Sequence, residues 1–235
     1  MERLSNIVTR GLLSLVLSTA AAAGFADSEL CAPFAKGVVD QSIVAKMLAS
    51  AKDGHLYRIE PASSRVAFCV DSPVGRVEGR FKDFRGGLTF VPTAAPAGDQ
   101  QAMVMVDTAS LETGAPLIEG MLKGEQFFDV KRYPEILFVS QQFRWVNSSE
   151  AVLIGDLTLH GVTRQVGFHV QLIDKEQPGG RRGTESILVK ATTRISRAEF
   201  GLKGLSPMVS DTVSLCMSVD AVRYRSLQTV TGRRG

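Results

Sequence analysis

Hydrophobic and polar residues alternate with a period of two along most of the chain from Tyr57 onward. Val66, Phe68 and Val70 alternate with mostly polar neighbours, and the same rhythm recurs in later stretches. Those stretches cover residues 76–82, 102–108, 135–145, 151–160, 163–173, 185–195 and 211–223. Because successive side chains of a strand point to opposite faces, this alternation is typical of strands with one buried face. The pattern therefore predicts an all-β domain over residues 57–223.

Closure into a barrel is the expected arrangement of these strands. Antiparallel strands with one apolar face must hide that face, and a closed barrel does so without leaving edges. At about eight strands, a barrel either fills with its own side chains or holds one small ligand. The alternation shifts at Phe84, which predicts a bulge or bend near Asp83, and Gly86-Gly87 permits a second bend. Residues 92–101, rich in Pro, Ala and Gly, are predicted to form a surface loop.

The candidate ligand-binding residues are those that the alternation turns toward a common interior. They are Phe68, Val70, Val77, Phe81, Phe138, Leu157, Leu159, Phe168, Val170, Val213 and Leu215. Gly79 and Gly155 fall on the same inward register, which favours a cavity because Gly gives up packing volume. Gly also marks strand bends. The pattern by itself leaves a filled barrel and a ligand cavity equally open.

Two segments precede the barrel. Arg3, Arg10, an apolar run and Gly24-Phe25-Ala26 are typical of a secretory signal peptide over residues 1–26, with a retained anchor as the alternative. In residues 27–56, a helical period predicts an amphipathic helix over 41–53. Its apolar positions are Ile43, Val44, Met47, Leu48 and Ala51. We expect this helix to pack against the main domain, and contact with a membrane or partner is the alternative.

The charge balance excludes one class of partner. Removal of 26 of the 235 residues leaves 209, and loss of Arg3, Arg10 and Glu2 lowers the formal charge by one, from +3 to +2. A near-neutral chain with no basic cluster interleaved with aromatics is not expected to bind nucleic acid. Residues 224–235 are predicted to form a basic, solvated tail.

Three cysteines, Cys31, Cys69 and Cys216, suffice for one disulfide in an exported protein. The last two lie on the outward faces of the first and last barrel strands, which must pair if the barrel closes. We therefore expect a Cys69–Cys216 disulfide. A bridge from Cys31 to either, or no bridge at all, remains open.

The polar residues do not form a recognisable catalytic or metal site. His160 and His169 both fall on the outward face and are separated by ~20 Å along the strand, too far to share one ion. The residues Asp129, Lys131 and Glu135 are expected to form a solvated rim, and no nucleophile motif is present. Arg164, Arg194 and Arg197 are expected to pair with surface acids or to reach a phosphate or quinone oxygen. We expect no enzymatic activity, metal or cofactor.

Short motifs in a fixed order carry a family likeness. They are YRIE at 57–60, SRVAF at 64–68, Gly75 with GRF at 79–81, SLETG at 110–114, LKGEQFFDV at 122–130, YPEI at 133–136, GDLTLHGVTR at 155–164, RAEFGL at 197–202 and SDTV at 210–213. In order and spacing over residues 57–223 the chain resembles the YceI-like family of bacterial exported proteins. It departs from that family in its N-terminal helix, in its cysteines, and in Ser72-Pro73 where a His is common.

The resemblance implies a lipocalin-like, eight-stranded antiparallel barrel in the periplasm. It also implies a long amphiphilic isoprenoid ligand, such as a polyprenyl alcohol, a polyprenyl phosphate or a ubiquinone-like lipid, held without chemistry. The rival hypothesis is a ligand-free module that docks a membrane redox protein through the 41–53 helix or the Phe127-Phe128 loop. Ligand length, head group and oligomeric state, a homodimer included, stay open.

Overall fold

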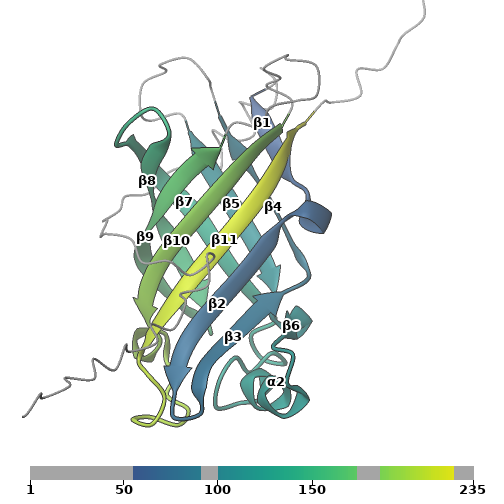
Figure 1. The fold of residues 1–235 in the computed structure, drawn as a ribbon, viewed down its shortest axis with the longest axis vertical. Helices are drawn as coiled ribbons and strands as arrows, with labels where there is room; N and C mark the ends of the chain where they lie inside the picture. Colours follow the sequence, from purple (N-terminus) through teal and green to yellow (C-terminus); the bar gives the residue numbers. More distant parts are fainter. Residues whose placement is uncertain (1–54, 91–99, 174–185, 225–235) are drawn as a thin grey trace, which may run out of the picture.

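The computed structural model describes residues 55–90, 100–173 and 186–224, which form one antiparallel sheet closed into a barrel (Figure 1). The predicted signal peptide (1–26), the predicted helix (41–53) and nearly all of the basic tail lie outside the described residues, as does most of the predicted 92–101 loop. Within the described part of the chain, no helix has the length and hydrophobicity needed to cross a membrane.

Eleven strands and one short α-helix make up the described fold. The strands are β1 (Leu56–Ile59), β2 (Arg65–Ser72), β3 (Gly75–Phe81), β4 (Phe84–Thr89), β5 (Gln101–Asp107), β6 (Leu111–Glu112), β7 (Glu135–Trp145), β8 (Glu150–Leu159), β9 (Val162–Ile173), β10 (Ser186–Ser196) and β11 (Thr212–Arg223). The helix is α2 (Pro116–Lys123), and the 3-10 turns are η1 (Pro61–Ser63), η2 (Thr108–Ser110) and η3 (Ala198–Phe200).

The eleven strands combine into the eight strands of the predicted lipocalin-like barrel, because three barrel strands are interrupted. β1 and β2 both pair with β11 and are separated by η1, which begins at Pro61. β4 pairs with β1, and β3 pairs with β2. In the next barrel strand, β5 pairs with β4, and β6 pairs with β3. The β1–β11 pairing closes the ring. The eight-stranded antiparallel barrel is therefore confirmed.

The predicted break near Asp83 separates β3 from β4. β4 runs without interruption through Gly86-Gly87. A side chain at Gly86 would meet the backbone of Met103, and one at Gly87 would meet the backbone of Tyr57. These two glycines therefore allow neighbouring strands to approach closely.

The β8–β9 hairpin turns at His160-Gly161. Both residues have positive φ (52° and 73°), as a two-residue turn of this hand requires. Leu159 pairs with Val162 and Thr158 with Thr163, so only His160 and Gly161 lie between the paired residues. The His160 ring packs on Tyr133, with ring centroids 4.3 Å apart.

The barrel interior is packed unevenly along its axis. Toward the end where β1 begins, aromatic side chains fill the interior, including the edge-to-face pair of Phe138 and Phe168 with centroids 5.0 Å apart. A register shift between Ser140 and Gln142 in β7 adds Phe143 to this buried set. At the opposite end lie α2, the β2–β3 turn and the β10–β11 connection (Figure 1). That end holds a cavity.

Candidate functional site

An apolar cavity of about 450 Å³ occupies the end of the barrel next to α2. Its walls come from the strands, from α2 and from three connections. The lining residues are Phe68, Val70, Ser72, Pro73, Val74, Val77, Phe81, Ile118, Met121, Leu122, Phe127, Phe128, Ile136, Leu157, Leu159, Ile195, Arg197, Leu202, Leu205, Met208, Val209, Val213 and Leu215. Only Ser72 and Arg197 among them carry polar side chains. The size lies within the range of sites that hold small molecules.

Most of the predicted interior residues line this cavity. They are Phe68, Val70, Val77, Phe81, Leu157, Leu159, Val213 and Leu215. Phe138, Phe168 and Val170 are buried but do not line it, so the prediction that they face the same cavity is wrong. They lie farther along the barrel axis, where Phe138 packs against Phe168 and Val170 is opposite Ala191. Alternation predicts the face of a residue but not its height in the barrel.

The two inward glycines make room for rings rather than for the cavity. Gly79 is opposite Phe68, and a side chain at Gly79 would collide with that ring. Gly155 is opposite Ser140, and a side chain there would meet the Phe138 ring and the backbone of Val139. The volume that these glycines give up is filled by neighbouring aromatic side chains. The inference from glycine to cavity is therefore wrong, although the cavity exists.

The paired phenylalanines after α2 form part of the cavity wall. Phe127 and Phe128 are buried, and the Phe128 ring packs 5.6 Å from the Phe68 ring and 5.7 Å from the Phe81 ring, centroid to centroid. This loop therefore turns its rings inward, which removes one of the two docking surfaces that the redox-docking hypothesis names; the other, the 41–53 helix, lies outside the described residues. Period-two reasoning missed Phe127 and Phe128 because a loop has no alternation.

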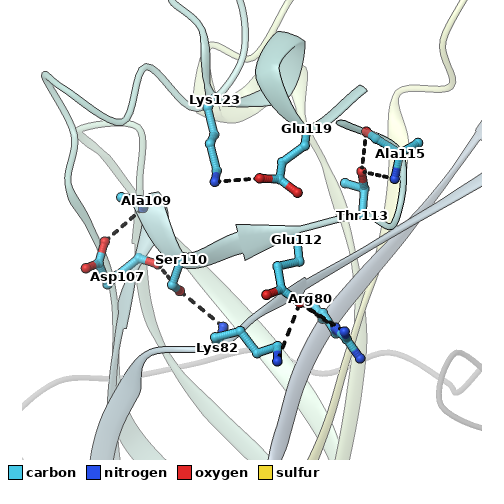
Figure 2. A network of polar contacts seen from close by, with 10 residues as sticks. All are labelled: Arg80, Lys82, Asp107, Ala109, Ser110, Glu112, Thr113, Ala115, Glu119 and Lys123. Carbon is cyan, nitrogen blue, oxygen red and sulfur yellow. Dashed lines mark hydrogen bonds and ion pairs between the residues drawn. The ribbon is translucent and has the colours of Figure 1, made fainter. Parts of the chain in front are cut away.

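A polar network anchors β6, the strand that precedes α2, at this end of the barrel (Figure 2). Glu112 of β6 accepts a hydrogen bond from Arg80 Nη2 at 2.9 Å and lies 3.5 Å from Lys82 Nζ. The hydrogen bond from Arg80 holds the pKa of the Glu112 carboxyl below its ordinary value. Within the helix, Lys123 donates to Glu119 at 2.9 Å. These contacts tie the strand that precedes α2 to β3, and so position Ile118, Met121 and Leu122 over the cavity.

Arg197 organises the loop that forms the other side of the opening. We call residues 202–210 the mouth loop. Arg197 is 5% exposed and donates to four backbone carbonyls of this loop. The acceptors are the oxygens of Leu202 (2.6 Å), Gly204 (2.7 Å), Val209 (2.9 Å) and Ser210 (2.9 Å). The guanidinium therefore shapes the loop that carries Leu205 and Met208. The prediction that Arg197 pairs with surface acids or reaches a ligand oxygen is wrong, because its donors are used inside the protein.

The other polar candidates lie away from the cavity. Arg164 and Arg194 are exposed, and neither lines it. Glu135 pairs with Arg85 at 3.3 Å, and neither Asp129 nor Lys131 reaches the lining. The side chain of Ser72, at the position where the resemblance implies a His, donates to the Gly75 carbonyl at 2.7 Å and so stabilises its own turn.

The β8–β9 hairpin carries both candidate histidines. His160 lies in the turn with its ring on Tyr133, and His169 lies on β9 opposite Val152 of β8. Across residues 55–90, 100–173 and 186–224, no group of three His, Cys, Asp or Glu side chains has the geometry of a metal site.

The predicted Cys69–Cys216 disulfide is wrong. Cys216 is a free, buried thiol, and Cys69 is engaged in a different disulfide. The strands do pair as expected, but Cys69 is opposite Ser214 and Cys216 is opposite Ala67. The two cysteines are therefore diagonal neighbours, ~7–8 Å apart rather than the ~5.5–6 Å between Cα atoms that a disulfide prefers. The sequence places both on the same face but does not reveal this two-residue offset.

The cavity offers hydrophobic contact with almost no hydrogen bonding. Of its two polar side chains, Ser72 is bonded within its turn and Arg197 donates four of its five N–H groups to backbone carbonyls. A ligand held here would be selected by shape and apolar surface. No lining residue can act as a base, because serine bonded to its own turn and a permanently charged guanidinium do not accept protons.

Known proteins resemble this chain over the whole barrel. A family model described as the YceI-like domain matches residues 57–221. A UPF0312 protein of Pseudomonas putida strain W619 is 35% identical over 151 residues, which cover 63% of this chain and 75% of that protein. The crystal structure of Burkholderia cenocepacia BcnA superposes with a TM-score of 0.60 at 25% identity, covering 70% of this chain and 99% of that one. A polyisoprenoid binding domain from Saccharophagus degradans, 18% identical, shares the fold with a TM-score of 0.53 over 72% of this chain and 98% of that one. The chain therefore belongs to the YceI-like family.

Proposed function

We propose that this protein binds an isoprenoid lipid, an alcohol, phosphate or quinone with a prenyl chain, in the cavity beside α2, without chemistry on it. The observation that carries the proposal is the cavity itself, about 450 Å³ of space with an apolar lining. The polyisoprenoid binding domain from Saccharophagus degradans, which has the same fold, supports the choice of ligand class. The signal-like residues 1–26 support the periplasm as the place where it acts.

The cavity volume suggests how much of such a chain is enclosed. At ~30 Å³ for a group about the size of a water molecule, 450 Å³ is space for on the order of 15 groups, or about three isoprene units. Burial of ~15 such groups at ~0.8 kcal/mol each gives ~12 kcal/mol before the entropy of association is subtracted. A longer chain would place its last units in the cavity and leave the remainder at the mouth, because Phe138 and Phe168 fill the barrel beyond it.

The test combines native mass spectrometry with two lipid probes. Mature protein, purified without detergent, is incubated with farnesol, whose chain has the length that the cavity accommodates, and with solanesol, a longer polyprenol. We expect one lipid bound per barrel for each probe. Val77 lines the cavity, so Val77→Phe should fill part of it and weaken binding at least about tenfold.

The matched control is Val222→Phe. Val222 is 41% exposed and does not line the cavity, so the same gain in side-chain volume should leave uptake unchanged. A barrel that takes up neither lipid would refute the proposed function. Equal binding by Val77→Phe and wild type would show that the lipid binds elsewhere.

A further inference from the structure

Exposed apolar side chains surround the opening of the cavity. Val74 (85% exposed), Met208 (62%), Met121 (43%) and Leu205 (38%) line the cavity and also reach solvent, which marks them as its mouth. Leu117, 90% exposed, lies one helical turn before Met121 on the same face of α2. We call these five residues the apolar rim.

The apolar rim consists of residues from three segments that are distant in the sequence. Its members come from the β2–β3 turn, from α2 and from the mouth loop, which all lie at one end of the barrel (Figure 1). Among the described residues, nine large hydrophobic side chains are exposed, and five of them belong to this rim. The other four, Trp145, Val146, Val222 and Tyr224, do not line the cavity. Single exposed apolar residues are ordinary, but a contiguous patch around a cavity marks an interaction surface.

The charges in the segments that carry the apolar rim are mostly positive. These segments, residues 72–76, 117–121 and 202–210, contain Arg76 and Lys203 and a single carboxylate. The first acidic residue of α2, Glu119, is paired with Lys123. An apolar patch flanked by cations is the combination that binds membrane interfaces, where anionic lipids give a negative surface potential.

Hydrogen bonds within the protein fix the segments that carry the apolar rim. Arg197 fixes the mouth loop through four carbonyls, and Ser72 closes the β2–β3 turn through Gly75. The network around Glu112 ties the strand before α2 to β3. A preorganised surface loses less conformational entropy when it docks.

We propose that the apolar rim docks the barrel, mouth first, on the surface of an anionic lipid bilayer, so that the lipid passes directly between membrane and cavity. This inference rests on the proposed function. A prenyl chain that left the bilayer through water would expose its whole apolar surface, whereas a mouth seated in the interface keeps that surface covered throughout. The side chains of the rim would occupy the boundary between head groups and acyl chains.

The test is flotation of the ligand-free protein with vesicles of phosphatidylcholine, with and without phosphatidylglycerol. We expect the wild type to float with the phosphatidylglycerol vesicles, and to float less when salt is raised. The double variant Leu117→Asp/Lys203→Glu should bind these vesicles at least about tenfold more weakly, because one rim side chain becomes charged and one cation is reversed.

The control variant carries the same change of charge at a site away from the rim. Val146→Asp/Arg144→Glu alters two exposed residues on and beside β7, and it should float like the wild type. The inference is overturned if the wild type stays in solution with both kinds of vesicle, or if the two double variants lose binding equally.

Farnesol uptake from dilute solution separates this inference from the proposed function. Neither Leu117 nor Lys203 lines the cavity, so the double variant at these positions should still bind farnesol at equilibrium. Val77→Phe should show the opposite pattern, with flotation kept and uptake lost. Uptake without flotation in the wild type would refute docking alone, and flotation without uptake would refute the lipid cavity alone.

Discussion

Replacement of Arg197 by lysine tests whether one buried guanidinium maintains the mouth of the cavity. Three nitrogens of Arg197 donate to four backbone carbonyls of the mouth loop at 2.6–2.9 Å, and the residue is 5% exposed. A lysine side chain keeps the positive charge but presents all its donors from a single nitrogen. One ammonium cannot reach carbonyls that surround a planar guanidinium on several sides.

The expected loss follows from the number of carbonyls left without a donor. A hydrogen bond to a charged group contributes ~1.5–3 kcal/mol, and a buried group left unpaired is destabilising by ~1–3 kcal/mol. If the ammonium keeps about two of the four bonds, the free energy of unfolding should fall by ~3–5 kcal/mol. Native domains are stable by only ~5–15 kcal/mol, so this is a large fraction of the total.

Equilibrium unfolding in urea measures this loss. The single tryptophan, Trp145, packs against Phe143 and Phe90, away from the mouth loop, so its fluorescence reports unfolding of the barrel as a whole. Arg194→Lys is the matched control, because Arg194 is exposed and should change the unfolding free energy by less than ~0.5 kcal/mol. If Arg197→Lys is also within ~0.5 kcal/mol of the wild type, the four carbonyl bonds do not stabilise the barrel and the reasoning fails.

Two further predictions concern single titratable groups. Burial raises the pKa of the Cys216 thiol to about 12. This thiol should therefore not react with a disulfide reagent at pH 8 in the native protein, and should react once urea unfolds the chain. A rapid reaction in the native state that is absent in Cys216→Ala would contradict this prediction. Hydrogen bonds from Ser196 and the Ala198 N–H, with the nearby Arg197 charge, lower the pKa of Asp211. A lowered pKa adds stability above the ordinary value of 3.8 that is lost as pH falls through the folded-state value. The urea midpoint of the wild type should therefore drop more between pH 7 and pH 3 than that of Asp211→Asn, and parallel drops would show that Asp211 is not a source of acid sensitivity.

Much of the barrel could be read from alternation alone. The inward faces of β2, β3, β8 and β11 follow from period-two patterns, because the pleat of a strand sends successive side chains to opposite faces whatever the rest of the molecule does. The break near Asp83 was visible for the same reason, as a shift in that period. The family resemblance then set the number of strands and the expected class of ligand.

The cavity wall formed by loops and α2 could not be predicted in this way. Phe127, Leu205 and Met208 reach the cavity only because the α2–β7 and β10–β11 connections return to the same end of the barrel. Nothing in their local sequence distinguishes a ring that turns inward from one that faces solvent. Arg197 likewise resembles any surface arginine until the mouth loop folds around it.

Local pattern and tertiary structure therefore account for different properties of this protein. Alternation is set by bonds between adjacent residues, so it specifies the face of each strand residue. Height along the barrel axis and the offset between paired strands depend on how strands slide past one another, which is a property of the assembled sheet. That is why the prediction for Phe168 has the right face but the wrong level, and why Cys69 and Cys216 pack together on neighbouring strands without a disulfide between them.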